Sequence, residues 1–336
     1  MQKTRWAILG PGAIAESFAK WLPSSEHGEL RAVASRDPER AAVFATRYGA
    51  EISGTYAEIL ARDDVDAVYV ATVHTTHADL AVAALEAGKA VLCEKPLAPS
   101  AAETERVLAA AERAGLPVVE AYKHRFSPLA RAIDRRLQWG QVTLPLQVRT
   151  QFGFEAGSRD GRLFDPELAG GAIFDVGGYP VSFAVAVAAS AGVALEHLNL
   201  EAAHGRVGGA TGHVEGGVDV YSTAWLGAEG FTAYVDCSID TQLSKRADIV
   251  GDGGWITLES AFGERDLSPT TLDHFHDGRR TTIEVAQVHP FAAEADAVSR
   301  ALRDGRLESR AMPWEQTRTV ARLLDAWHAT VMAGVR

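Results

Sequence analysis

The chain has 336 residues, which is enough for two domains, since single hydrophobic cores stop growing near about 250 to 300 residues. Its formal net charge of −11, without a lysine- or arginine-rich run, argues against binding to nucleic acid or anionic membranes, so we expect small-molecule partners. Because it has only two cysteines and no apolar stretch approaching about 18 to 20 residues, we expect a soluble cytoplasmic protein without disulfides or membrane spans.

The first third of the chain alternates short aliphatic runs with longer segments of helical period. The predicted strands are 6–9, 30–34, 67–71, 90–92 and 117–121, and the predicted helices are 14–22, 38–48, 77–87 and 100–114. Strands and helices that alternate in this way favour a doubly wound α/β fold, in which helices cover both faces of a parallel sheet. We assign residues 1–122 to this Rossmann domain.

Beyond residue 137 the pattern changes to period 2. In "GFTAYVDCSID" apolar and polar residues alternate, which indicates a half-buried antiparallel strand. Similar alternation over 217–226 and a hairpin signal at "GDGG" (251–254) predict a large open, mostly antiparallel sheet. Helices over 291–303 and 314–332 close a second α/β domain, 123–336, whose last helix is a candidate to pack back on the first domain.

The polar side of such a sheet must meet water, a helix or a second subunit. A homodimer or higher homo-oligomer formed through this sheet and an ordinary solvated face are both open on the sequence alone.

A glycine-rich loop, "GPGAIA", follows the first predicted strand and opens the first helix. Gly10 permits the tight turn, and Gly12 lets backbone approach a pyrophosphate. The phosphates are expected at the helix N-terminus, beside Ala13 and Ile14, where free N–H groups favour anions. The alternative is an ordinary tight turn, but this context predicts dinucleotide binding.

The second strand ends at "SRD", where a cofactor without a 2′-phosphate usually meets an acidic residue about 20 positions past the loop. Ser35 and Arg36 stand there instead, and a hydroxyl and a guanidinium suit a phosphate. Asp37, which follows, also fits a cap for the helix that starts at Pro38. The pattern favours NADP over NAD.

Lys95 follows the predicted strand 90–92 in "VLCEKPLA". The carboxyl ends of parallel strands face the ligand crevice, so we expect this lysine near the nicotinamide. The alternative is an ordinary surface lysine in a loop.

The segment "FDVGGYPVSF" places Asp175 and Tyr179 four residues apart, on one face if the segment is a helix. They are candidates for catalysis, and Gly177 and Gly178 between them are expected to leave room for a ligand. The alternative is that the aspartate caps a helix and the tyrosine belongs to the core.

Three further residues, Tyr122, His124 and Arg162, are weaker candidates for substrate binding. The first two follow the predicted strand 117–121, where they line the crevice or merely fix the next helix. His74 and His77 have no matching third ligand nearby in the sequence, so no metal site is expected.

Four segments in this order resemble the glucose–fructose oxidoreductase, inositol dehydrogenase and MocA (Gfo/Idh/MocA) family: "GPGAIA", "HADLAVAALEAGKAVLCEKPLA", "EAYKHRFSP" and "RLFDPELAGGAIFDVGGYP". The resemblance covers nearly the whole chain and is strongest to the dimeric dihydrodiol dehydrogenases and NADP-dependent xylose dehydrogenases, which have a tyrosine where inositol dehydrogenases have histidine.

The resemblance implies that Lys95 contacts the substrate, Asp175 binds a substrate hydroxyl and Tyr179 donates or accepts the proton. It also implies that Thr72, His74, His77 and Glu94 line the nicotinamide site. The family's usual proline after Thr72 is replaced here by Val73, which makes the shape of that loop less certain.

These features predict an NADP-dependent dehydrogenase or reductase for a sugar, an inositol-like polyol or a cyclic trans-diol. A tyrosine with its usual pKa near about 10 is a poor base at neutral pH, and the cation of Lys95 is expected to favour the phenolate. The alternatives are a redox-neutral hydrolase or lyase that uses NAD transiently, and a non-catalytic dinucleotide sensor.

Overall fold

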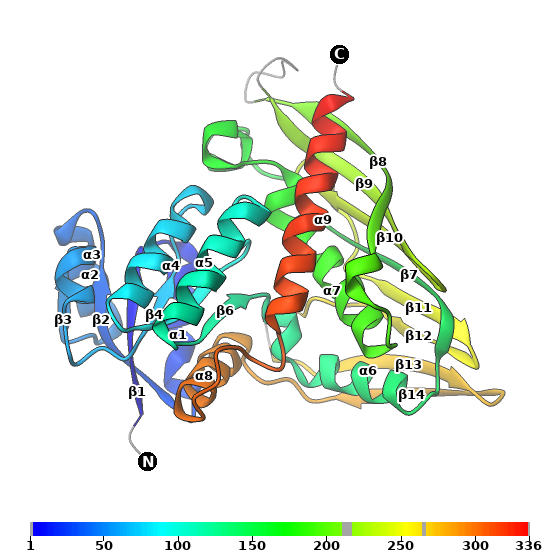
Figure 1. The fold of residues 1–336 in the computed structure, drawn as a ribbon, viewed down its shortest axis with the longest axis horizontal. Coiled ribbons are helices and arrows are strands. Elements are labelled where there is room, and N and C mark those ends of the chain that lie inside the picture. Colours follow the sequence, from blue (N-terminus) through cyan, green and yellow to red (C-terminus); the bar gives the residue numbers. More distant parts are fainter. Residues whose placement is uncertain (1–2, 210–216, 264–266, 335–336) are drawn as a thin grey trace. The chain divides into compact units, whose positions relative to one another are not determined.

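The computed structural model describes residues 3–209, 217–263 and 267–334, and the chain divides into two compact units (Figure 1). The first consists of Met1–Phe126 and Val288–Thr317, and the second of Ser127–Gln287 and Arg318–Arg336. The sequence placed the border after residue 122 and named the last helix as a candidate to pack back on the first domain. In the structure, helix α8 (Pro290–Arg303) belongs to the first unit, and most of the last helix, α9 (Trp314–Ala333), belongs to the second.

The first unit contains a six-stranded sheet in the order β3-β2-β1-β4-β5-β6, and all its pairs are parallel. The strands are β1 (Thr4–Leu9), β2 (Gly28–Ala34), β3 (Ile52–Gly54), β4 (Ala67–Val70), β5 (Ala90–Glu94) and β6 (Val118–Ala121). This is the classic dinucleotide-binding order, so the predicted doubly wound fold is confirmed. The sequence missed β3 and the short helix α3 (Tyr56–Leu60), because so few residues show no period.

Helices cover both faces of this sheet, which is why its strands read as continuous apolar runs. The other helices of the unit are α1 (Ala13–Trp21), α2 (Pro38–Tyr48), α4 (His77–Glu86) and α5 (Ala101–Ala114). Aliphatic side chains of α4 and α5 form one core with β4 and β5. On α1, Phe18 stacks on Tyr69 with ring centroids 4.1 Å apart and meets Phe291 of α8 edge-on at 6.4 Å.

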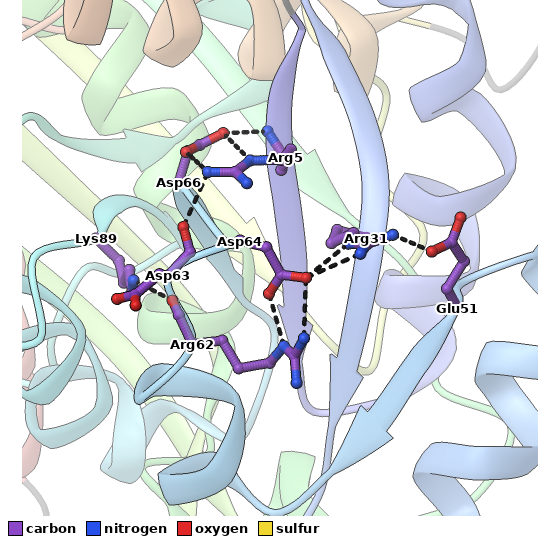
Figure 2. Close-up of polar contacts among 8 residues, drawn as sticks. All are labelled: Arg5, Arg31, Glu51, Arg62, Asp63, Asp64, Asp66 and Lys89. Atoms are coloured by element: carbon purple, nitrogen blue, oxygen red, sulfur yellow. Dashed lines mark hydrogen bonds and ion pairs between the residues drawn. The ribbon is translucent and has the colours of Figure 1, made fainter.

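A network of ion pairs ties together the strands of this sheet near their amino ends (Figure 2). Asp66, directly before β4, accepts hydrogen bonds from Nε and Nη2 of Arg5 on β1 at 2.9 and 2.6 Å. Asp64 accepts from Arg62 at 2.7 Å and from Arg31 on β2 at 2.8 Å, and Arg31 also pairs with Glu51. This network lies at the opposite end of the strands from the glycine loop, so we read it as structural.

The second unit contains an eight-stranded sheet in the order β14-β13-β12-β11-β7-β10-β9-β8. Its strands are β7 (Thr143–Gly153), β8 (Asn199–Gly208), β9 (Val218–Ala228), β10 (Phe231–Ser238), β11 (Ala247–Asp252), β12 (Gly254–Leu258), β13 (Thr270–His276) and β14 (Arg279–Val285). The predicted open, mostly antiparallel sheet and the hairpin between β11 and β12 are confirmed. The strand read from "GFTAYVDCSID" is antiparallel to β9 but parallel to β7, a pairing that alternation alone does not reveal.

Helices α6 (Pro128–Gln138), α7 (Gly178–Ser190) and α9 lie along one face of this sheet (Figure 1). The segment Pro166–Ser190, which ends in α7, is long and apolar enough to cross a membrane by length and composition alone. Most of it is buried inside the protein, as is typical of a core helix.

Candidate active site

The glycine loop joins β1 to α1. Gly10 has φ +96°, and a Cβ atom there would lie 2.6 Å from Cγ2 of Thr72, so only glycine fits. A Cβ on Gly12 would meet nothing within 4 Å, and this N-cap residue offers no side chain to the N–H groups of the first turn. Open space over an uncapped helix N-terminus fits the pyrophosphate expected beside Ala13 and Ile14.

The end of β2 resolves the two readings of Asp37. Its Oδ1 accepts hydrogen bonds from the backbone N–H groups of Glu39 and Arg40, so it caps α2. Ser35 is buried, and its hydroxyl accepts from the N–H of Asp37 at 3.1 Å. The acidic group at this position is therefore committed to the helix.

Two arginines flank this corner, and the sequence identified only one. Burial raises the pKa of Tyr56, and the positive charges of Arg36 and Arg40 oppose that rise. Nη2 of Arg40 also lies 3.4 Å from the carbonyl oxygen of Pro11 in the glycine loop. The sequence did offer one indication of Arg40: it lies in the first turn of the predicted helix that Asp37 caps, close to the end of β2.

The loop after β4 is tied to the loop after β5 by a buried histidine. The Nδ1 and Nε2 atoms of His77 lie 2.8 Å from the carbonyl oxygen of Pro96 and 3.2 Å from that of Thr72. His74 is also buried, with its ring centroid 5.6 Å from that of His77. These contacts set the shape of the loops, and the contact of these three residues with a cofactor stays a prediction.

Lys95 stands at the carboxyl end of β5 between two buried acids. Burial raises the pKa of Glu94, and burial raises the pKa of Glu120 on β6 to about 7, while the charge of Lys95 opposes both rises. Glu94 accepts a hydrogen bond from the hydroxyl of Tyr69 at 2.5 Å, and Glu120 accepts from the N–H of Leu97 at 2.9 Å. The lysine therefore sits in a structured, charged corner of the first unit.

The weaker candidates after β6 are both buried. The rings of Tyr122 and His124 meet edge to face with centroids 6.1 Å apart. Burial holds the pKa of His124 well below its usual value, so its imidazole is neutral at physiological pH. Their contact with a substrate stays a prediction.

In the second unit, the structure brings together two of the predicted site residues. Nη2 of Arg162 donates to Oδ1 of Asp175 at 2.9 Å. The aspartate side chain is only 9% exposed, whereas the arginine is 43% exposed and so remains accessible to a ligand. A charge-assisted bond of this kind fixes the direction of the carboxylate.

Tyr179 lies in the first turn of α7, directly after a π-helical turn, η6 (Ile173–Gly177), that carries Asp175. The sequence suggested one regular helix, and π-turns of this kind are frequent at functional sites. The tyrosine ring packs edge to face against Phe152 and Phe262, with centroids 5.1 and 5.7 Å away, so its direction is fixed.

Gly177 does not leave room for a ligand as we expected. A Cβ atom there would lie 3.1 Å from Cζ3 of Trp327 and 3.2 Å from Sγ of Cys237. The glycine instead lets η6 pack closely against α9 and β10.

Comparison with known proteins agrees with this architecture. Residues 4–122 match the family model GFO_IDH_MocA, described as an oxidoreductase family with an NAD-binding Rossmann fold, and residues 130–257 match the model of a GFO/IDH/MocA C-terminal domain. Over 98% of both chains, the protein is 33% identical to D-xylose 1-dehydrogenase (NADP(+)) 2 of Haloferax volcanii. The chain belongs to the Gfo/Idh/MocA oxidoreductase family.

Other proteins also match this chain over nearly its whole length and nearly the whole of their own. The mouse (Mus musculus) trans-1,2-dihydrobenzene-1,2-diol dehydrogenase is 30% identical over 96% of this chain and 95% of its own. Among solved structures, the 3-ketoreductase KijD10 of Actinomadura kijaniata, in complex with NADP and TDP-benzene, is 26% identical with a TM-score of 0.85, over 100% of this chain and 98% of its own. The aldose-aldose oxidoreductase of Caulobacter crescentus, complexed with glycerol, is 25% identical with a TM-score of 0.87, and the match covers 99% of this chain and 98% of that chain.

Proposed function

We propose that this protein transfers a hydride between NADP and the carbon of a hydroxyl or carbonyl group in a sugar, an inositol-like polyol or a cyclic trans-diol. The observation that carries the proposal is the Arg162–Asp175 ion pair on the buried segment that also presents Tyr179. In support, the two dehydrogenases reported above are named for xylose and for a dihydrodiol.

The preference for NADP rests on the corner at the end of β2. Ser35, Arg36 and Arg40 offer a hydroxyl and two guanidinium groups for a 2′-phosphate, and Asp37 is engaged as a helix cap. Gly10 and Gly12 would let the pyrophosphate approach the N-terminus of α1. When bound, the nicotinamide would accept or supply the hydride, with Lys95, Glu94 and the loop after β4 shaping its surroundings.

The residues of this chain would manage the proton. As a hydroxyl is oxidised its O–H proton must leave, and in reduction the carbonyl oxygen must receive one. In our proposal Tyr179 exchanges this proton, and the cation of Lys95 favours its phenolate form. Asp175, oriented by Arg162, accepts a hydrogen bond from a neighbouring substrate hydroxyl and so fixes the carbon that reacts.

The test is nicotinamide absorbance with NADP⁺ and NAD⁺ against a panel of aldopyranoses, inositols and trans-cyclic diols. We expect Tyr179→Phe and Lys95→Ala each to lower kcat by roughly 100-fold or more, the usual range for general acid–base groups, while NADP⁺ still binds to Tyr179→Phe. The double variant should lose far less than the product of the two losses, because residues that act as a unit are not additive.

The matched control is Tyr48→Phe, which removes a phenolic hydroxyl from α2 and should leave kcat unchanged. Full turnover by Tyr179→Phe would contradict the assigned role. Tight cofactor binding without turnover of any polyol would favour the redox-neutral enzyme or the sensor.

We further propose that the protein is a homodimer of a reducing compartment such as the cytoplasm, in which two copies pair through the outer face of the second unit's sheet. Trp225 and Val250 on that face are 44% and 48% exposed, and large exposed apolar groups often mark interfaces. Cys93 and Cys237 are both free and buried, which fits a reducing environment.

A further inference from the structure

A buried acid of the second unit has no place in the mechanism so far. Asp219 lies near the start of β9 and is 0% exposed. Its Oδ2 accepts a hydrogen bond of 2.7 Å from the backbone N–H of Ile173, the first residue of η6. Ala172 occupies the N-cap position there and has no side chain that can cap, so the strand supplies the cap that the segment itself lacks.

The other carboxyl oxygen of Asp219 is packed against the residue that precedes this cap. A Cβ atom on Gly171 would lie 2.2 Å from Oδ1 of Asp219, and Gly171 has φ +105°. The carbonyl oxygen of Gly171 in turn accepts from the N–H of Asp175 at 3.1 Å. Both oxygens of one carboxyl group therefore meet the turn that determines where Asp175 lies.

The strand is irregular at this position. Along β8, Arg206 pairs with Tyr221 and the next residue, Val207, pairs with Asp219, so Val220 is an extra residue in β9. Such a β-bulge changes the direction of the neighbouring side chains and is over-represented beside active sites.

We propose that Asp219 is a positioning residue, whose carboxyl group fixes the start of η6 and thereby the places of the Asp175 carboxylate and the Tyr179 hydroxyl. Its kinetic consequence rests on the proposed function. Burial among apolar groups makes this carboxyl group costly to ionise, so a role limited to packing would be served as well by an apolar side chain.

The test compares Asp219→Ala, Asp219→Asn and the control Val220→Ala, each assayed well below its own unfolding temperature. A displacement of about 1 Å at a reacting group costs on the order of 100-fold in rate, so we expect a kcat loss of that order in Asp219→Ala. The Kd for NADP⁺ should not change. Asparagine keeps an oxygen for the N–H of Ile173, so Asp219→Asn should recover most of the loss.

Val220→Ala removes buried apolar bulk from the same strand and should lose stability without losing kcat. An unchanged kcat in Asp219→Ala would overturn the proposal. An equal kcat loss in Val220→Ala at matched stability would overturn it too, because the effect would then be a general weakening of the sheet.

Amide hydrogen exchange separates this inference from the proposed function. In Asp219→Ala we expect faster exchange at Ile173 and Asp175, and no change in the first unit. If wild-type protein turns over none of the polyols, the proposed function fails, but faster exchange at these amides still supports the positioning role. Unchanged exchange there would overturn it, whatever the activity.

Discussion

Arg40 is a residue whose role depends on where its helix begins. Because Asp37 caps α2, the side chain of Arg40 lies in the first turn of that helix and reaches back to the carbonyl oxygen of Pro11. Neither Arg36 nor Arg40 forms an ion pair within the described residues, so both are available to a phosphate.

Replacing Arg40 tests the cofactor corner. Hydrogen bonds to charged groups contribute about 1.5 to 3 kcal/mol, so Arg40→Ala should weaken NADPH binding by roughly 10- to 100-fold and leave NADH binding nearly unchanged. Nicotinamide fluorescence titrations with both reduced cofactors measure this. Arg47→Ala, on the same helix but paired with Glu16, is the control. Equal losses for the two cofactors would contradict the assignment.

The site residues that the sequence proposes lie in short motifs. Gly10, Gly12 and Lys95 follow strands, and Asp175 and Tyr179 stand four apart, so local patterns alone single them out as candidates. Asp219 lies beside a β-bulge and accepts a hydrogen bond from the N–H of Ile173, 46 positions away. No local sequence pattern indicates that contact. Gly177 was misread for the same reason, since Trp327 and Cys237 approach it from distant elements.

At the scale of elements, arginine–aspartate pairs join β1 and β2 to the segment just before β4, near the amino ends of the strands (Figure 2). Arg5 holds the pKa of Asp66 below its usual value, although burial opposes this. Arg62 and Arg31 hold the pKa of Asp64 far below its usual value.

These shifts predict an acid-sensitive sheet. A depressed carboxyl pKa contributes stability that is present above the unfolded pKa of about 3.9 and is lost as the pH falls through the folded value. Asp66→Asn should lower the free energy of unfolding by about 1 kcal/mol at neutral pH, because the pair is partly exposed. The difference should shrink in acid, as thermal unfolding at several pH values will show.

Asp63→Asn is the matched control, since Asp63 offers Arg5 only its backbone carbonyl oxygen. The same destabilisation from both variants, at all pH values, would contradict a role for the Asp66 side chain.

At the scale of the whole molecule, the described helices α6, α7 and α9 of the second unit lie along one face of its sheet and leave the other face open (Figure 1). Trp225, Tyr234 and Arg149 stand opposite one another on three neighbouring strands. The rings of the first two lie 4.9 Å apart, and the guanidinium of Arg149 lies 5.7 Å from the ring of Tyr234. Val250 stands two residues from Asp248, the next partner in this row, and so shares its face.

We expect the proposed dimer to form through this row of residues, and we expect negative charges introduced into the row to dissociate it. Trp225→Glu with Val250→Glu should shift sedimentation from dimer to monomer at micromolar concentration, because two unpaired carboxylates would be desolvated in the interface. Val43→Glu, at a 71% exposed apolar residue of α2, should leave the assembly unchanged. A wild-type protein that sediments as a monomer would contradict this interface.

The return of α8 to the first unit has a consequence for the order of synthesis. Phe291 and Asp296, which contact Phe18 and Ser25, leave the ribosome more than 160 residues after Phe126. At about 5 to 20 residues per second this is a delay of roughly 10 to 30 s, during which the nascent Rossmann sheet lacks the helix that covers part of one face. Premature termination anywhere between Ser127 and Gln287 should therefore yield a fragment that chaperones retain.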